Sequence, residues 1–72
     1  MEKEVLLKKF GARIREIRKG EGITQVQLAH SVGKEQQSIQ RLEAGNINPS
    51  YYYLCEVAAG LDITVEAIIR IH

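Results

Sequence analysis

Apolar residues recur along the chain with a helical period, and the strict alternation typical of strands is nearly absent. Positions four, four and three residues apart form the first apolar stripe, Leu6, Phe10, Ile14 and Ile17. This stripe predicts a helix over residues 2–18, ended by Gly20 and Gly22. No linker, internal repeat or low-complexity tract interrupts the pattern, so residues 1–72 are predicted to form a single domain.

Two short helices are predicted next, over residues 25–32 and 36–44. Thr24 and Gln27 form a capping box before the first of them. Gly33 can adopt the left-handed conformation that a sharp turn between the two needs. Their inward-facing residues are expected to be Leu28, Ala29, Val32, Ile39 and Leu42. A helix, a short glycine turn and a second helix form the geometry that presents one helix to the major groove of DNA.

The last third of the chain predicts two more helices. Ser50 can cap a fourth helix, in which Tyr51 is expected in the core. Tyr52 and Tyr53 are expected to be more exposed, and Thr64 can cap a short fifth helix. The other inward-facing residues are expected to be Leu54, Val57, Ala58, Leu61, Val65, Ile68 and Ile69. Five short helices with tight connections predict a compact all-α domain whose helices cross at steep angles.

The composition narrows the function. The 72-residue length is near the lower limit for a self-sufficient core, so tight packing or a second copy of the chain must help bury apolar surface. Cys55, the single cysteine, excludes an intrachain disulfide and is expected to be a small buried hydrophobic residue. His30 and His72 have no companions at metal-ligand spacing, so no metal and no other cofactor is expected. No phosphate-binding glycine loop or nucleophile elbow occurs, which argues against an enzyme.

Cellular location and charge add two further expectations. A lone thiol and the lack of a long apolar run favour a cytoplasmic protein with no membrane partner. Residues 1–19 contain seven basic and three acidic residues, giving +4, whereas residues 20–72 contain three basic and six acidic residues, giving −3. The basic end suits DNA phosphates, and an ordinary solvated basic helix explains it equally well.

The helix predicted over residues 36–44 has an outward face suited to reading bases. Ile39 and Leu42 are expected to face the core. The opposite face carries four polar residues, Gln36, Gln37, Gln40 and Arg41. Glutamine can bond bidentately to adenine, and arginine to guanine. Glutamine is also a good helix former, so a merely solvated polar face is the alternative interpretation.

Residues 23–50 read ITQVQLAHSVGKEQQSIQRLEAGNINPS and resemble the phage repressor and Cro-like (Xre-type) helix-turn-helix family. The resemblance extends from about Phe10 to Ile69 and implies a five-helix fold of the lambda-repressor-like type, with the helix-turn-helix formed by the second and third helices. The run QQSI at residues 36–39 is particularly similar to the recognition helix of a lambdoid phage repressor. The base contacts that this resemblance implies are Gln36, Gln37 and Arg41, with Gln40 nearer the groove wall.

The resemblance also implies contacts outside the reading face. It places Gln25, at the start of the second helix, on a DNA phosphate. Asn46 and Asn48 match a loop that approaches the phosphodiester chain, although asparagine is equally typical of a plain turn. Arg18 and Glu43 match a partly buried salt bridge that ties the first helix to the recognition helix.

Three features depart from the family pattern, one of which is the unusual tyrosine run at residues 51–53. Lys34 and Glu35 stand where serine or threonine often caps the third helix. Glu35 suits the positive end of a helix dipole, yet it would face the DNA backbone or a cytosine N4 donor. No arginine follows Pro49, so a minor-groove arginine is missing there.

These features predict a sequence-specific transcription regulator that binds double-stranded DNA as a homodimer, each copy reading one half-site of a palindromic operator. Ile71 and either Tyr52 or Tyr53 are expected at the contact between the copies. The alternative is an antitoxin-type protein-interaction module on the same fold, which would bind a toxin partner and its own operator. A third possibility is a dimerisation domain from a longer regulator.

Overall fold

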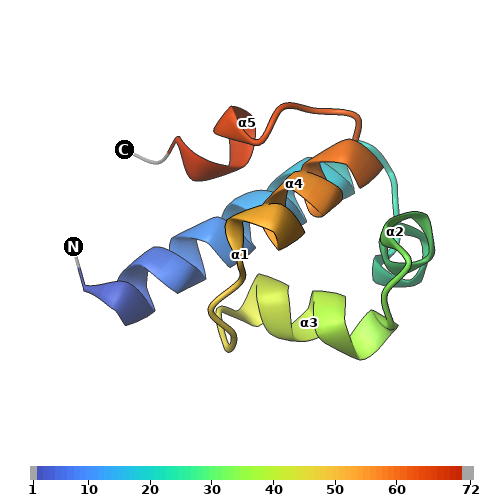
Figure 1. Ribbon diagram of the computed structural model, residues 1–72. Coiled ribbons are helices and arrows are strands. Elements are labelled where there is room, and N and C mark those ends of the chain that lie inside the picture. The colour runs from blue at the N-terminus through green and yellow to red at the C-terminus, as the bar shows by residue number, and fades with distance from the viewer. Residues whose placement is uncertain (1, 71–72) are drawn as a thin grey trace.

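The computed structural model describes residues 2–70, which form five helices and no strand (Figure 1). The helices are α1 (Lys3–Gly20), α2 (Gln25–Val32), α3 (Gln36–Ala44), α4 (Tyr51–Gly60) and α5 (Glu66–Ile69). In Figure 1, α1 crosses the molecule diagonally, α3 runs along its lower edge and α5 lies on the opposite side. The predicted all-α, five-helix fold is confirmed.

The bounds of α2 and α3 follow from their caps. The Thr24 hydroxyl oxygen accepts a hydrogen bond from the backbone N–H of Gln27 at 3.1 Å, and Gln27 Oε1 accepts one from the backbone N–H of Thr24 at 2.8 Å. Gly33 and Gly45 then end α2 and α3 with φ values of 73° and 76°. This left-handed backbone favours glycine, which has no Cβ. The predicted ranges of both helices are confirmed.

The end of α1 differs from its prediction. The helix continues through Gly20, two residues beyond the expected end at Arg18. The backbone N–H of Glu21 still bonds to the carbonyls of Ile17 and Arg18, at 3.0 and 3.2 Å. Gly20 is therefore the last helical residue, and the left-handed turn falls at Gly22, the second of the two glycines expected to end the helix.

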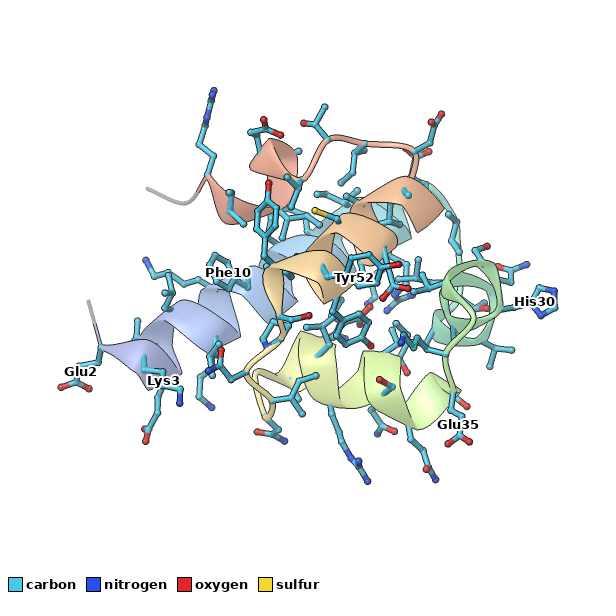
Figure 2. All side chains as sticks on the ribbon, in the orientation of Figure 1. Glu2, Lys3, Phe10, His30, Glu35 and Tyr52 are labelled. Atoms are coloured by element: carbon cyan, nitrogen blue, oxygen red, sulfur yellow. The ribbon has the colours of Figure 1, made fainter. Side chains whose placement is uncertain are left out.

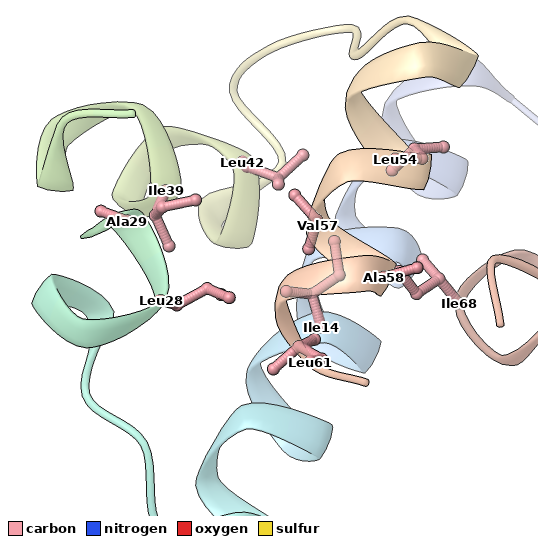
Figure 3. Packing of buried hydrophobic residues seen from close by; sticks show 10 residues of the cluster. All are labelled: Ile14, Leu28, Ala29, Ile39, Leu42, Leu54, Val57, Ala58, Leu61 and Ile68. Carbon is pink, nitrogen blue, oxygen red and sulfur yellow. The ribbon is translucent and has the colours of Figure 1, made fainter. Parts of the chain in front are cut away.

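All five helices contribute to one apolar core. Its buried residues are Ile14, Leu28, Ala29, Ile39, Leu42, Leu54, Val57, Ala58, Leu61 and Ile68 (Figure 3). Each of them was predicted to face inward from the helical period. Burial of these side chains is the main term that stabilises the fold, because little else in a domain of this size opposes the conformational entropy of the unfolded chain.

The tyrosine run at the start of α4 is placed differently from the prediction. Tyr51 is 63% exposed, so its assignment to the core is wrong. Tyr52 is exposed as predicted, at 73%. Tyr53 is half-buried and packs against the core, although it was expected at the surface. The reason is tertiary, because the Tyr53 hydroxyl reaches Ser38 on α3 at 2.7 Å.

Two smaller predictions are also wrong. Thr64 does not cap α5, whose N-cap position is Val65 with no side-chain hydrogen bond. The amides at the start of this short helix bond instead to backbone carbonyls, Ala67 N–H to Thr64 at 3.1 Å and Ile68 N–H to Val65 at 2.9 Å. Cys55 is only half-buried, so it is not a fully buried core residue.

Across residues 2–70, no helix has the length and apolar character needed to cross a membrane.

Candidate DNA-binding interface

The polar face of α3 is open to solvent while its apolar face is held in the core. Ile39 and Leu42 are 0% and 1% exposed. The four residues predicted to read bases are all exposed, Gln36, Gln37, Gln40 and Arg41. A helix anchored in this way can enter a major groove without disturbing the packing behind it.

A shallow recess of about 350 Å³ lies on this outward face. Its lining residues are Gln37, Gln40, Arg41, Ala44 and Asn46. The recess therefore joins three of the predicted base-contact residues to one of the predicted phosphate-contact residues. Gln36 lies outside it, one residue before Gln37 at the start of α3.

Arg18 and Glu43 form a buried ion pair between α1 and α3. Arg18 Nε lies 2.6 Å from Glu43 Oε2, and Arg18 Nη2 donates to Glu43 Oε1 at 3.0 Å. The two side chains are only 8% and 3% exposed. Arg18 also donates through Nη1 to the Ile23 carbonyl at 2.7 Å. The hydrogen bond to Glu43 raises the pKa of Arg18 above its ordinary value, against the opposing effect of burial, so the guanidinium stays charged.

Gln25 joins the same network from the first turn of α2. Its side-chain Nε2 donates to Glu43 Oε1 at 3.1 Å. A carboxamide nitrogen carries two hydrogens, so one donor of Gln25 remains for another acceptor. This network of Arg18, Gln25 and Glu43 ties α1, α2 and α3 to one another at the C-terminal end of α3.

The loop between α3 and α4 is fastened to α1. A Cβ added at Gly45 would stand 2.8 Å from the Cα of Lys8, so the two backbones are in close contact. The backbone N–H of Asn46 closes the end of α3 by donating to the Arg41 carbonyl at 2.9 Å. Asn46 and Asn48 both have exposed side chains. They are therefore free to meet DNA, and the loop that carries them is fixed.

The comparison with known families decides the classification. The HTH_3 helix-turn-helix family matches residues 14–68, which is most of the chain. The chain belongs to the HTH_3 family.

Solved structures agree with this assignment. The restriction-modification controller protein C.AhdI from Aeromonas hydrophila is 34% identical, with a TM-score of 0.84 over 86% of this chain and 94% of that chain. The clp gene regulator ClgR from C. glutamicum is 26% identical, with a TM-score of 0.86 over 89% of this chain and 82% of that chain. A chain of the SinR protein/SinI protein complex is 31% identical, with a TM-score of 0.78 over 85% of this chain and 60% of that chain. No curated protein sequence matches this chain.

The family and these regulator relatives assign this HTH_3 chain to the non-enzymatic DNA-binding transcription regulators. The individual base and phosphate contacts remain predictions, because they depend on a DNA complex.

The HTH_3 chain also contains a contact to α3 that the sequence analysis missed. The hydroxyls of Ser38 and Tyr53 are 2.7 Å apart and join the first turn of α3 to α4. Lys34 lies over the Tyr53 ring, with Nζ 5.4 Å from the ring centroid, and 3.7 Å from Glu56 Oε1. The only sign of this contact in the sequence is Ser38, a hydroxyl residue on a predicted helix, and it does not identify Tyr53 as its partner.

Glu35 takes a position consistent with its departure from the family pattern. It is exposed just before α3, and Figure 2 shows it beside the N-terminal end of that helix. Its backbone has the extended conformation of an N-cap residue, with φ −83° and ψ 152°, but its side chain makes no capping hydrogen bond. The Glu35 carboxylate of the HTH_3 chain therefore makes no capping hydrogen bond at the start of the predicted reading helix.

Proposed function

We propose that this chain is a sequence-specific transcription regulator that reads the major groove with the outward face of α3 and binds a palindromic operator as a homodimer. The observation that carries the proposal is the division of α3 into two faces. Side chains able to form bidentate contacts with bases are exposed on one face, while Ile39 and Leu42 are buried on the other. Because Ile39 and Leu42 are held in the core, they fix the orientation of the base-reading side chains on the exposed face.

Phosphate contacts near the C-terminal end of α3 would set its register in the groove. Gln25, on α2, lies beside Glu43 at this end and has one amide hydrogen to spare. Asn46 and Asn48 lie just beyond the same end, in the loop that packs on α1. These contacts carry no sequence information, so they would act on all duplexes alike.

The low net charge and the exposed aromatic surface support the proposed dimerisation. The net charge of +1 gives little non-specific attraction to DNA, so two recognition helices are needed for useful affinity. Tyr51 and Tyr52 both expose large side chains at the start of α4, which favours a contact with a second copy there. Tyr53 is withdrawn from this role by its bond to Ser38. Ile71, also expected at the contact, lies outside the described residues.

A protein-interaction role on the same fold is the second candidate, because one similar structure is a complex of the SinR and SinI proteins. No toxin is among the similar proteins described above, so the proposal does not include a toxin partner. In this second role, a partner protein would bind the chain whether or not DNA is present.

Selection of bound duplexes from a random DNA pool, followed by sequencing, tests the proposal. The expected result is an enriched palindrome with half-sites about one helical turn apart. Enrichment of a single, unrepeated site would contradict the homodimer. Recovery of no motif at all would contradict sequence-specific reading and favour the protein-interaction role.

A further inference from the structure

A second recess, of about 420 Å³, lies between α1 and α3. Its lining residues are Arg15, Arg18, Gln25, Gln40, Glu43 and Ala44. Gln40 and Ala44 also line the recess on the outward face of α3, so the two recesses meet along that edge of the helix. The second recess therefore borders the predicted reading face on the side of α1.

The charge in this recess comes from Arg15. Glu43 also lines it, but Arg18 holds both carboxylate oxygens, and the Glu43 side chain is 3% exposed. The pair is neutral as a unit. Arg15 is exposed on α1, and no acidic side chain within residues 2–70 forms a salt bridge with it. One cation is thus left facing the recess with no anion opposite.

The other donors in the recess are carboxamides. Gln25 keeps one amide hydrogen after its bond to Glu43, and the exposed Gln40 can turn its amide toward the recess. A guanidinium beside amide donors suits a phosphate, since a guanidinium can donate two parallel hydrogen bonds to phosphate oxygens. The recess is open, so it suits a phosphate that stays attached to a longer chain.

The neighbouring part of α1 continues this basic edge. Lys8 lies seven residues before Arg15, two turns away on the same side of the helix, and its backbone touches Gly45 in the loop that precedes Asn46. Lys9 lies about 120° around the helix from Arg15 and points away from this edge. Lys8 and Arg15 therefore form a basic edge of α1 beside α3.

We propose that the recess binds a phosphate of the DNA backbone and that Arg15 supplies the charge for this contact. The inference rests on the proposed reading of DNA by α3. When the outward face of α3 enters the major groove, its α1 side meets the sugar-phosphate wall of the groove. Arg18 then has a second role beside its structural one, because it neutralises a carboxylate that would otherwise repel the phosphate.

The test compares Arg15→Gln with Lys9→Gln, which removes the same charge from the other side of α1. Binding to a duplex of random sequence is followed by fluorescence anisotropy over a series of salt concentrations. For Arg15→Gln, the slope of log K against log salt should become shallower by about 0.9 per bound chain, which corresponds to roughly an eightfold loss of affinity at 0.1 M salt. Lys9→Gln should match the parent chain, and Arg15→Lys should restore the parent slope.

Gln40→Glu gives an independent check, because it places a carboxylate in the same recess and should weaken binding to the random duplex. Circular-dichroism melts of each variant establish that it is folded. If Arg15→Gln and Lys9→Gln give the same slope while the parent binds DNA, the phosphate contact is wrong and the reading role of α3 stands. A change confined to one base pair, with an unchanged slope, would make Arg15 a base contact and overturn the proposal. If the folded parent binds no duplex, both the phosphate contact and the proposed function are wrong.

Discussion

Gly11 of α1 lies directly against Glu43 of α3, so that a Cβ built on Gly11 would stand 2.4 Å from the Glu43 carbonyl oxygen. The obstructing atoms belong to the backbone, and the Leu42 carbonyl oxygen is almost as close, at 2.5 Å. No side-chain movement can relieve such a contact. The same segment of α3 carries the carboxylate that pairs with Arg18, so backbone contact and ion pair together fix α3 on α1.

Gly11→Ala should destabilise the protein because α3 would have to move away from α1. Overpacking of this kind typically costs about 1–3 kcal/mol, which outweighs the gain of up to about 1 kcal/mol from the higher helix propensity of alanine. Gly20→Ala is the matched control, since Gly20 is also in α1 and a Cβ there meets nothing within 4 Å. Urea unfolding should show a lower midpoint for Gly11→Ala and an equal or higher one for Gly20→Ala. A Gly11→Ala chain as stable as the parent would show that the two helices are not in close contact.

Arg18→Ala should be much more damaging than Lys9→Ala. Removal of Arg18 leaves the Glu43 carboxylate buried without its cation, which typically costs about 3–5 kcal/mol. Lys9 is exposed on α1, so its replacement should change stability little. Thermal melts of the two variants measure the difference, and equal melting temperatures would refute the importance of the pair.

Ser38 and Tyr53 should behave as a coupled pair. Ser38→Ala and Tyr53→Phe each remove one hydroxyl of the 2.7 Å contact, so each should cost about 0.5–1.5 kcal/mol. The double variant should cost less than the sum of the two, because the same hydrogen bond is lost in all three. The free energies of unfolding in a double-mutant cycle give the coupling directly. Strict additivity would mean that the two hydroxyls do not interact.

Gln37→Ala and Gln25→Ala should separate base reading from phosphate contact. Gln37 is exposed on α3, so its replacement should leave the melt unchanged and remove preference at one base pair per half-site, worth about 1–3 kcal/mol of discrimination. Gln25→Ala should weaken binding to all sequences by a similar factor. The measurement is a binding series on the selected operator and its single-base variants. If Gln37→Ala and Arg41→Ala both discriminate as the parent does, α3 is not the reader.

Tyr52→Lys should weaken the dimer. Tyr52 is 73% exposed, so the change should leave the fold intact while it places like charges opposite each other at a symmetric contact. Light scattering should show a larger share of monomer for this variant than for the parent at equal concentration. A parent chain that is monomeric both free and on DNA would refute the dimer altogether.

Local rules determined most of the secondary structure. The helical period of apolar residues placed all ten buried core residues correctly, because each helix must turn its apolar stripe toward the others. The capping box at Thr24 and the left-handed glycines set the bounds of α2 and α3. These are interactions between near neighbours in the chain, so the sequence contains both partners within one window. The chain's resemblance to a helix-turn-helix family rested on the same segment.

Contacts between distant segments decided the rest. Tyr51 and Tyr53 are equally aromatic and stand two residues apart, yet only Tyr53 is drawn inward, because Ser38 and Lys34 happen to lie on its side of α4. The exclusion of a side chain at Gly11 likewise depends on where α3 crosses α1. The recess around Arg15 unites residues from three helices, and its charge depends on Arg18 having neutralised Glu43. Periodicity states which face of a helix is buried, but the crossing of two helices determines which atoms meet there.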